Sequence, residues 1–344
     1  MTESGTYLFA VAVADRFDLP ADLTKLPGEF GQVRAVAADG LVALVSSYSG
    51  PAIEDVPQNE LTGRLLLHQK VIEDLMPGGS LLPVRVGTVL KDDEGVASFL
   101  GGSQKLLLTT WEQFRGTVEV DIAATWNLGE VLAQVSVDPE VVAAKAAAMS
   151  ASPESRPAAV VGVGQLVGRK LDQRRSELES LVLASMSPLA KDVRLNAVVS
   201  DELVCNLALL VDTIKAGQID DALHRLDADL EGRYDFRRVG PLPPYSFATV
   251  HVNRIEPSQL QQALAMLGLP GSFDESAVLE RYRELAMARH PDVRTGDPGA
   301  AKDFEELTSA KAIALSVCRN RTDTSEILGS TVLFASIERS AGRD

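Results

Sequence analysis

Few side chains in this sequence of 344 residues could carry catalysis. It has four histidines and two cysteines, and no histidine stands near a serine or cysteine in a recognisable nucleophile motif. Cys205 and Cys318 are isolated from each other, which argues against a metal-type pair and suits a reduced cytosolic environment. His68 falls on or near the apolar stripe of a predicted helix, so we expect a packed, hydrogen-bonded histidine. These residues predict a protein that is not an enzyme and needs no metal or cofactor.

A glycine-rich segment offers the one alternative that involves a nucleotide. Gly162, Gly164 and Gly168 follow an apolar run, but their spacing is one residue longer than the dinucleotide-binding fingerprint. The acidic residue expected about 20 positions later is also missing, since the chain there still has a helical pattern. We therefore interpret the glycines as a turn leading into a helix at 166–189. A nucleotide-dependent enzyme that uses this turn remains the third hypothesis.

The tripeptide His290-Pro291-Asp292 lies near the C-terminal end, between two predicted helices. Helices are expected at 257–267, from Ser272 or Asp274 to Arg289, and at 299–317. The histidine and aspartate would then be presented on a short loop at the end of a helix pair. The charged side chains of the helix before the loop are of both signs: Glu280, Arg281, Arg283, Glu284 and Arg289.

Composition excludes several classes of function. The formal net charge is −15 and the pI about 4.8, so bulk charge does not favour nucleic acid or an anionic lipid surface. No run reaches the roughly 18 apolar residues that a membrane span needs. The apolar residues at 7–14 are followed at once by Asp15-Arg16, which favours a first strand over a signal peptide.

The first third of the chain predicts a sheet with helices on one face. Strands are expected at 6–14 and on both sides of Asp39-Gly40, a dipeptide typical of hairpin turns. A helix is expected at 59–76, where apolar residues recur every three or four positions. The other expected elements are a proline-interrupted strand at 81–89, a short helix at 92–100 and a strand at 116–126. This order favours an α+β sandwich over a doubly wound parallel sheet.

The middle of the chain predicts a second unit of similar kind. An alanine-rich helix should start at Asp138-Pro139 and end in the segment 150–157, whose Ser, Pro and Ala content we interpret as a hinge. Strands are expected at 195–199 and 203–211, and a helix at 218–230. The order of strands and helices is close to the split βαβ, or ferredoxin-like, arrangement.

A proline-rich segment, 239–248, joins this unit to the helical tail. Its three prolines hold the backbone extended and remove N–H donors, so the segment cannot be a central strand. Residues 245–252 then alternate and are rich in aromatic and β-branched side chains, which predicts a strand. A polyproline ligand is the other interpretation, but a single Pro-x-Pro-Pro without flanking disorder favours the lead into an edge strand.

The same segment resembles a known family. Gly240-Pro241-Leu242-Pro243-Pro244-Tyr245-Ser246-Phe247 is similar to a signature near the end of the gas vesicle GvpL/GvpF proteins. Other stretches agree in order, namely Tyr7-Leu8-Phe9-Ala10, then His68 with Val71 and Glu73, then residues 82–89 with Pro83, Arg85 and Gly87. The resemblance covers about residues 5–252. It implies two α+β domains and a non-enzymatic role in gas vesicle formation, beside the small hydrophobic shell protein and other gas vesicle accessory proteins.

The helical tail resembles a J domain, the Hsp70-activating module of DnaJ-type proteins, over about residues 257–318. The resemblance rests on Leu267-Gly268-Leu269, Tyr282 to Ala286, the His-Pro-Asp loop, and Phe304 to Leu307 with Ala310. It implies that the loop meets Hsp70 together with basic side chains, here Arg281, Arg283 and Arg289. The sequence departs from the pattern at Glu280 and Glu284, at Val293 in place of lysine and at Lys311 in place of tyrosine. A kept fold with weak Hsp70 coupling is compatible with these departures.

These observations predict the fold class and its division. The class is α+β, with two ferredoxin-like α+β domains followed by a small all-helical J-domain-like module. The expected parts are 1–115, 116–254 with its hinge near 150–157, 255–320, and a tail at 321–344 that is apolar enough to dock on the body. Ile327, Leu328, Val332, Leu333 and Phe334 supply the apolar character of the tail.

The first functional hypothesis is an assembly factor located at the gas vesicle and in the cytoplasm. A shell subunit with one apolar face is an aggregation hazard before assembly. An acidic partner could cover it by strand addition at an open sheet edge or with an apolar patch, and the J-like module could recruit an Hsp70. The second hypothesis is a general J-domain co-chaperone with varied clients. Neither hypothesis requires nucleic acid or a membrane.

Overall fold

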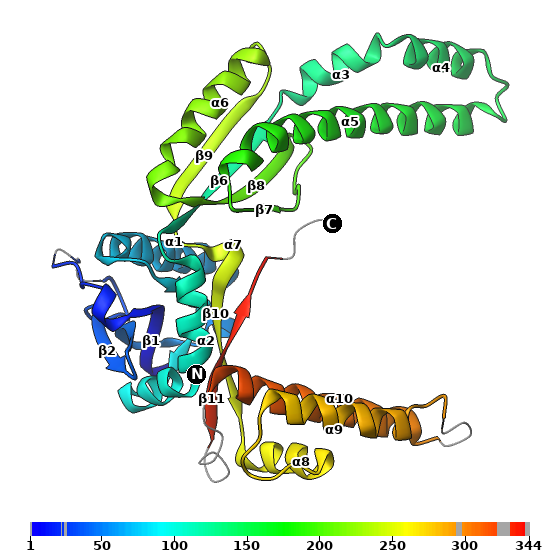
Figure 1. Cartoon of the computed structure of the whole chain (residues 1–344). Helices are drawn as coiled ribbons and strands as arrows, with labels where there is room; N and C mark the ends of the chain where they lie inside the picture. The colour runs from blue at the N-terminus through cyan, green and yellow to red at the C-terminus, as the bar shows by residue number, and fades with distance from the viewer. Residues whose placement is uncertain (1, 22, 24–25, 294–297, 322–330, 341–344) are drawn as a thin grey trace. The chain divides into compact units, whose positions relative to one another are not determined.

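The computed structural model describes residues 2–21, 23, 26–293, 298–321 and 331–340. They group into two compact units. The first unit combines Met1–Arg115 with Pro243–Arg339, and the second is built on Gly116–Leu242. The chain therefore leaves the first unit at Gly116 and returns to it at Pro243 (Figure 1).

An antiparallel sheet is the centre of the first unit. Its strand order is β2-β3-β1-β4, and β5 also pairs with β1. Asp39 and Gly40 both have positive φ, 51° and 78°, so the turn between β2 and β3 is the left-handed kind that Asp-Gly favours. The strands are β1 (Thr2–Val13), β2 (Arg34–Ala38), β3 (Leu41–Pro51), β4 (Leu82–Pro83) and β5 (Val89–Leu90). The predicted hairpin is confirmed, and the strand predicted at 81–89 is reduced to two short pieces.

Two long helices pack against this sheet. Helix α1 (Gln58–Leu75) lies where the periodicity placed it and buries Ile72 and Leu75. Helix α2 (Asp93–Phe114) begins at an Asp92 cap whose side chain accepts from Gly95 N–H at 2.9 Å. The helix predicted at 92–100 is present but its predicted length was wrong, because α2 continues through Gly101 and Gly102 and buries Leu107 and Trp111.

The second unit is also built on an antiparallel sheet, of order β7-β8-β6-β9. Alternate residues of β6, such as Val120 and Ile122, are fully buried, which gives one face of the sheet an apolar core. Helix α6 (Gly217–Asp229) buries Ile219 and Leu226. The strands are β6 (Thr117–Thr125), β7 (Asp192–Leu195), β8 (Leu203–Asp212) and β9 (Asp235–Leu242).

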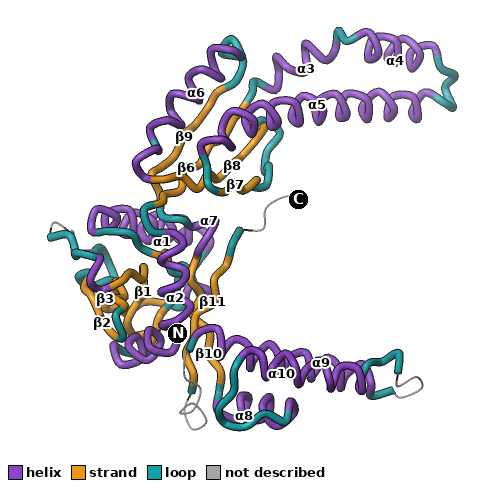
Figure 2. The backbone as a smooth tube through the Cα atoms, in the orientation of Figure 1, coloured by secondary structure: helices purple, strands orange, loops and turns teal. Residues whose placement is uncertain are grey.

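A helical arm extends from this second sheet (Figures 1 and 2). Helices α3 (Leu128–Ser136) and α4 (Pro139–Ser150) pack along α5 (Arg156–Met186). Gly162, Gly164 and Gly168 lie inside α5, and a Cβ on any of them would meet nothing within 4 Å. The glycine-rich turn was therefore a wrong prediction, and the strand-turn-helix context of a nucleotide fingerprint is absent at this position. Helix propensity over the 31 residues of α5 outweighs the three glycines.

Three long helices and two strands form most of the C-terminal part of the first unit. Helix α8 (Pro257–Leu267) starts with a capping box and ends at Gly268 with φ 64°. Helix α9 (Glu275–Arg289) is capped by Asp274, and α10 (Ala300–Asn320) packs on both. The expected helices are confirmed. Their shared core contains Leu260, Leu264, Leu267, Val278, Leu307 and Ala314.

This three-helix module lies, in the sequence, between two paired strands. Strand β10 (Thr249–Ile255) pairs antiparallel with β11 (Val332–Glu338) along its whole length. Strand β10 is joined to the first sheet where Arg85 N–H donates to Val250 O at 2.9 Å. Strand β11 packs on α2, and Asn320 Oδ1 accepts from Ala335 N–H at 3.1 Å. The module is thus held to the rest of the first unit through both strands. Val332 and Phe334 were expected to dock on the body, but they pack in the core of the three-helix module. Ile327 and Leu328 lie outside the described residues.

The proline-rich segment differs in part from its predicted structure. Gly240 to Leu242 belong to β9, an edge strand, as the loss of N–H donors requires. Tyr245–Ala248 forms the short helix α7, so the predicted strand begins only at Thr249. The reason is local: Pro244 O accepts from Phe247 N–H at 3.1 Å and from Ala248 N–H at 2.8 Å. β9 ends the second unit, whereas β10 belongs to the first.

Candidate functional site

The His-Pro-Asp loop is the exposed feature of the three-helix module. It follows the last residue of α9, at the end of the α9–α10 pair that points away from α2 (Figure 1). The His290 side chain is 46% exposed and the Asp292 carboxylate 90% exposed. As far as the first unit is concerned, both side chains are therefore accessible to a partner protein.

The imidazole of His290 is held in one orientation. Its Nδ1 accepts from Asp292 N–H at 3.2 Å, so in the neutral ring the proton is on Nε2. The ring also meets Phe304 of α10 edge to face, with centroids 5.2 Å apart. Val293 N–H donates to His290 O at 2.9 Å and closes the turn. The loop thus presents an Nε2–H donor beside an exposed carboxylate. Phe304 was part of the J-domain resemblance, but its contact with the His290 ring was not predicted from the sequence.

Of the three predicted basic contacts, one is engaged inside the module. Arg281 Nε donates to Leu267 O at 3.2 Å, and its guanidinium forms an ion pair with Glu284. Arg281 therefore ties α9 to the end of α8. Arg283 is exposed and Arg289 half-buried, and neither has an ion-pair partner among the described residues.

Lys311, where a tyrosine is usual, has a defined contact in this fold. Its ammonium lies 4.0 Å from the centroid of the Tyr282 ring, which is a cation–π contact between α10 and α9. The Tyr282 hydroxyl is also 3.4 Å from Thr308 Oγ1. The substitution therefore preserves a link between the two helices that carry the loop.

The residues that resemble the GvpL/GvpF family at 82–89 and 240–247 have structural roles: glycines at positions with positive φ and buried side chains. Gly240 has φ 127°, and a Cβ there would lie 2.8 Å from Glu119 O, so only glycine fits. Gly87 has φ 84° and lies against Ile53. Phe247 lies in helix α7 and is 1% exposed. Among the remaining predicted residues, Pro83, Pro243, Pro244 and Ser246 are buried, Tyr245 is half-buried, and Pro241 and Arg85 are exposed.

His68 of α1 is linked by a chain of hydrogen bonds to Tyr7 of β1 and to the segment 84–87. Gly87 N–H donates to the Tyr7 hydroxyl at 2.9 Å, and that hydroxyl is 2.9 Å from His68 Nδ1. His68 Nε2 lies 3.0 Å from Val84 O, which only accepts, so Nε2 is the donor and Nδ1 receives the tyrosine proton. Burial lowers the pKa of His68 to about 4 and raises the pKa of Tyr7 to about 12. The packed histidine predicted from sequence is confirmed.

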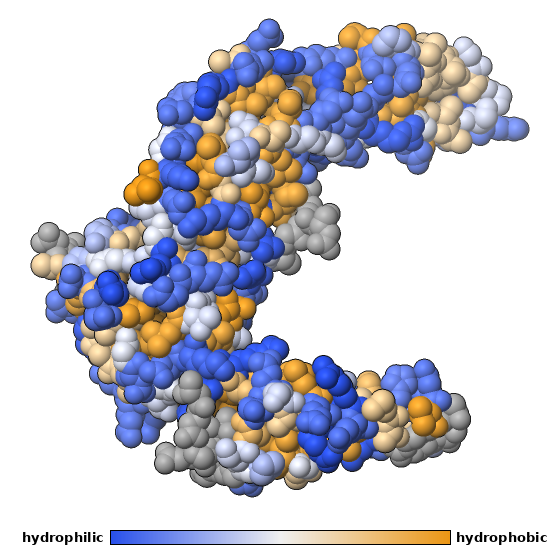
Figure 3. All heavy atoms as spheres, viewed as in Figure 1, coloured by the Kyte–Doolittle hydropathy of each residue, from blue (hydrophilic) through white to orange (hydrophobic). Residues whose placement is uncertain are grey.

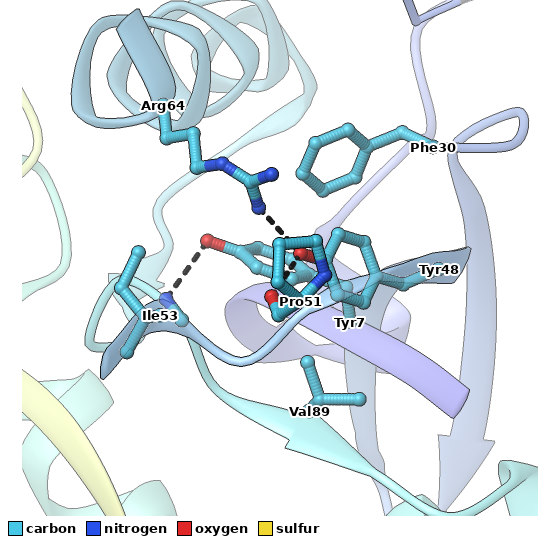
Figure 4. A pocket seen from close by; sticks show the side chains of 8 residues that line it. Tyr7, Phe30, Tyr48, Pro51, Ile53, Arg64 and Val89 are labelled. Carbon is cyan, nitrogen blue, oxygen red and sulfur yellow. Dashed lines mark hydrogen bonds between the residues drawn. The ribbon is translucent and has the colours of Figure 1, made fainter. Parts of the chain in front are cut away.

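A cluster of aromatic side chains beside these hydrogen bonds encloses a very small cavity (Figure 4). Tyr7, Phe30 and Tyr48 contribute rings, and Arg64 reaches Tyr48 and the Glu29 carboxylate. The cavity volume is about 10 Å³, which is room for at most one water molecule. The cluster therefore acts as packing, and not as a binding site for an organic ligand.

The described residues offer little for other chemistry. In this part of the chain no three His, Cys, Asp or Glu side chains come together as possible metal ligands. Its helices include none with the length and apolarity needed to cross a bilayer. Cys205 and Cys318 are both buried free thiols, and burial raises the pKa of Cys318 to about 11.

Comparison with known proteins matches the long N-terminal part of the chain to one family and the three-helix module to another. The family model described as gas vesicle synthesis protein GvpL/GvpF matches residues 5–249. Gas vesicle protein F of a Streptomyces species is 26% identical over 244 residues, which are 70% of this chain and 98% of that protein. The crystal structure of GvpF from Anabaena covers 71% of this chain and 98% of its own, with a TM-score of 0.57 and 23% identity. That structure supports the fold.

The second match lies in the three-helix module. A DnaJ domain model matches residues 263–322. DnaJ homolog subfamily C member 5B of Sus scrofa is 40% identical over 48 residues, which are 14% of this chain and 24% of that protein. The chain therefore combines a long match to gas vesicle proteins with a short DnaJ domain.

Proposed function

Because the chain belongs to the gas vesicle synthesis protein GvpL/GvpF family, we propose that it is an accessory protein of gas vesicle formation that binds the hydrophobic shell protein and recruits an Hsp70 to it. It acts in the cytoplasm and at the growing vesicle, beside other gas vesicle accessory proteins. Its role is binding and delivery, without catalysis of its own.

One observation carries the proposal. The DnaJ domain lies between β10 and β11, and both strands pack on the GvpF-like part of the first unit. An Hsp70 bound at the His-Pro-Asp loop would therefore be held at a fixed place on that unit. Such coupling suits delivery of one client class better than a DnaJ domain on a flexible linker would.

The helical arm offers a surface for the shell protein. Its exposed apolar side chains include Val142, Met149, Val160 and Val161, each at least 50% exposed. Figure 3 shows apolar atoms gathered on α4 and the start of α5. Apolar patches of this kind commonly mark protein interfaces. We propose this arm, rather than a sheet edge, as the first contact for the apolar face of the shell subunit.

The Hsp70 part is tested by substitution of the loop histidine. His290→Gln in the full chain should abolish stimulation of Hsp70 ATP hydrolysis while the thermal unfolding curve stays unchanged. His224→Gln, at an exposed histidine of α6, is the matched control and should stimulate like the wild type. Equal stimulation by wild type and His290→Gln would contradict the proposal.

The shell-protein part is tested by capture. The wild-type chain should bind purified shell protein selectively, and the double substitution Val160→Ser with Val161→Ser should weaken capture about tenfold. Broad capture of unrelated unfolded clients at similar strength would instead favour the general co-chaperone hypothesis.

A further inference from the structure

Two large apolar side chains stand beside the His-Pro-Asp loop. Met287, one helical turn before His290, is 71% exposed, and Val293, in the turn after it, is 67% exposed. In the described part of the DnaJ domain they are the only large apolar side chains with such exposure. The apolar exposure of this domain is therefore concentrated next to its loop.

Positive charge is not concentrated there. Helix α9 has three glutamates and three arginines, so its formal charge is zero. Arg281 is bound to Glu284 and to Leu267 O, and Arg319 of α10 is bound to Glu275 at 3.2 Å. Lys311 lies on the Tyr282 ring. Arg283 and Arg289 have no ion-pair partner among the described residues, but the three glutamates of α9 balance its three arginines, so the helix provides little net long-range attraction for an anionic partner.

We infer that the face formed by Met287, His290 and Val293 recognises an apolar patch on its Hsp70-type partner, so that this complex depends weakly on salt. This inference rests on the proposed function. The flexible thioether of Met287 can adapt to the shape of such a patch. A partner surface selected by charge would gain nothing from either side chain, whereas an apolar one would bury both while His290 and Asp292 make the polar contacts.

The experiment measures the concentration of the full chain that half-stimulates ATP hydrolysis by an Hsp70 from the same cell. Between ionic strengths of about 0.05 and about 0.5 M, this concentration should change less than about threefold, because helix α9 has no net charge for the salt to screen. The double substitution Met287→Ser with Val293→Ser should raise it about tenfold at both ionic strengths. Val199→Ser, at an apolar side chain that is 84% exposed outside the DnaJ domain and the arm, is the matched control and should have no effect.

The outcomes separate the inference from the proposed function. Stimulation that is lost in His290→Gln, falls more than tenfold with salt, and is untouched by the double substitution would overturn the inference alone. Stimulation that is absent in the wild type, or unaffected by His290→Gln, would overturn both. Thermal unfolding of the double variant shows whether its fold is kept, and Val293→Lys gives a second test, since it should make stimulation salt-dependent.

Discussion

His68 determines how three segments of the first unit meet. Its ring accepts from Tyr7 and donates to Val84 O, and the next residue, Arg85, donates to Val250 O of β10. A neutral imidazole fits this arrangement because Nδ1 must accept. The buried ring thus supports the place where the first sheet is joined to β10.

This arrangement predicts a pH dependence of stability. The folded pKa of His68 is about 4, below its ordinary value of 6.5, so the unfolded state binds more protons between these values. The free energy of unfolding should therefore have its highest value above pH 6.5. As the pH drops, it should decrease from that value by about 2 kcal/mol at pH 5 and about 3 kcal/mol near pH 4. Urea unfolding at several pH values measures it.

The control is substitution of the same residue. His68→Gln should be less stable at pH 7, because one hydrogen bond of the chain is lost, and should lack most of the fall between pH 6.5 and 4. The exposed variant His224→Gln should keep the wild-type fall. An unchanged pH dependence in His68→Gln would show that other groups cause it.

At the scale of elements, two helical glycines have opposite roles. A Cβ at Gly102 of α2 would lie 2.2 Å from Leu333 O of β11, whereas a Cβ at Gly164 of α5 would meet nothing. Gly102 is needed for close packing of a strand on a helix, and Gly164 only weakens its helix.

The two glycines therefore predict effects of opposite sign. Gly102→Ala should destabilise the chain by about 2 kcal/mol, since the backbone of β11 must move, although alanine is the better helix former. Gly164→Ala should stabilise by about 0.5–1 kcal/mol. Chemical denaturation of the two variants measures both values. Stabilisation by Gly102→Ala would mean that β11 does not pack on α2 as described.

At the scale of the whole molecule, the DnaJ domain lies between two paired strands, which predicts that it can be removed without unfolding the rest. Ile255 and Val332 are direct partners in the β10–β11 ladder, so the chain can be closed there by a short hairpin turn. The helices have their own core, in which the strands supply Ile255, Val332 and Phe334. The cluster around Phe9, Leu44 and Ile72 is separate.

Replacement of residues 256–331 by a two-residue Asn-Gly turn should leave the rest of the chain folded. We expect a cooperative unfolding transition, retained capture of shell protein and no stimulation of Hsp70 ATP hydrolysis. Circular dichroism and the two binding assays measure these outcomes. Loss of the cooperative transition would show that the first unit needs the helices for its stability.

Local patterns in the sequence were sufficient for the elements that depend on local forces. The Asp39-Gly40 hairpin, helix α1 and helices α8 to α10 were predicted, because turn chemistry, capping and apolar periodicity act over a few residues. Of the two caps expected for α9, Ser272 or Asp274, the structure has Asp274. The proline-rich motif and the His-Pro-Asp loop also identified both families. Both motifs are recognisable in the sequence because each consists of particular residues at fixed spacing.

Only the tertiary structure decided which distant segments meet. The length of α2 and the use of Gly102 depend on β11, more than 200 residues away in the sequence. The return of the chain to the first unit depends on the β10–β11 ladder and on Val84. These choices come from long-range packing and backbone hydrogen bonds, whose partners no local pattern specifies.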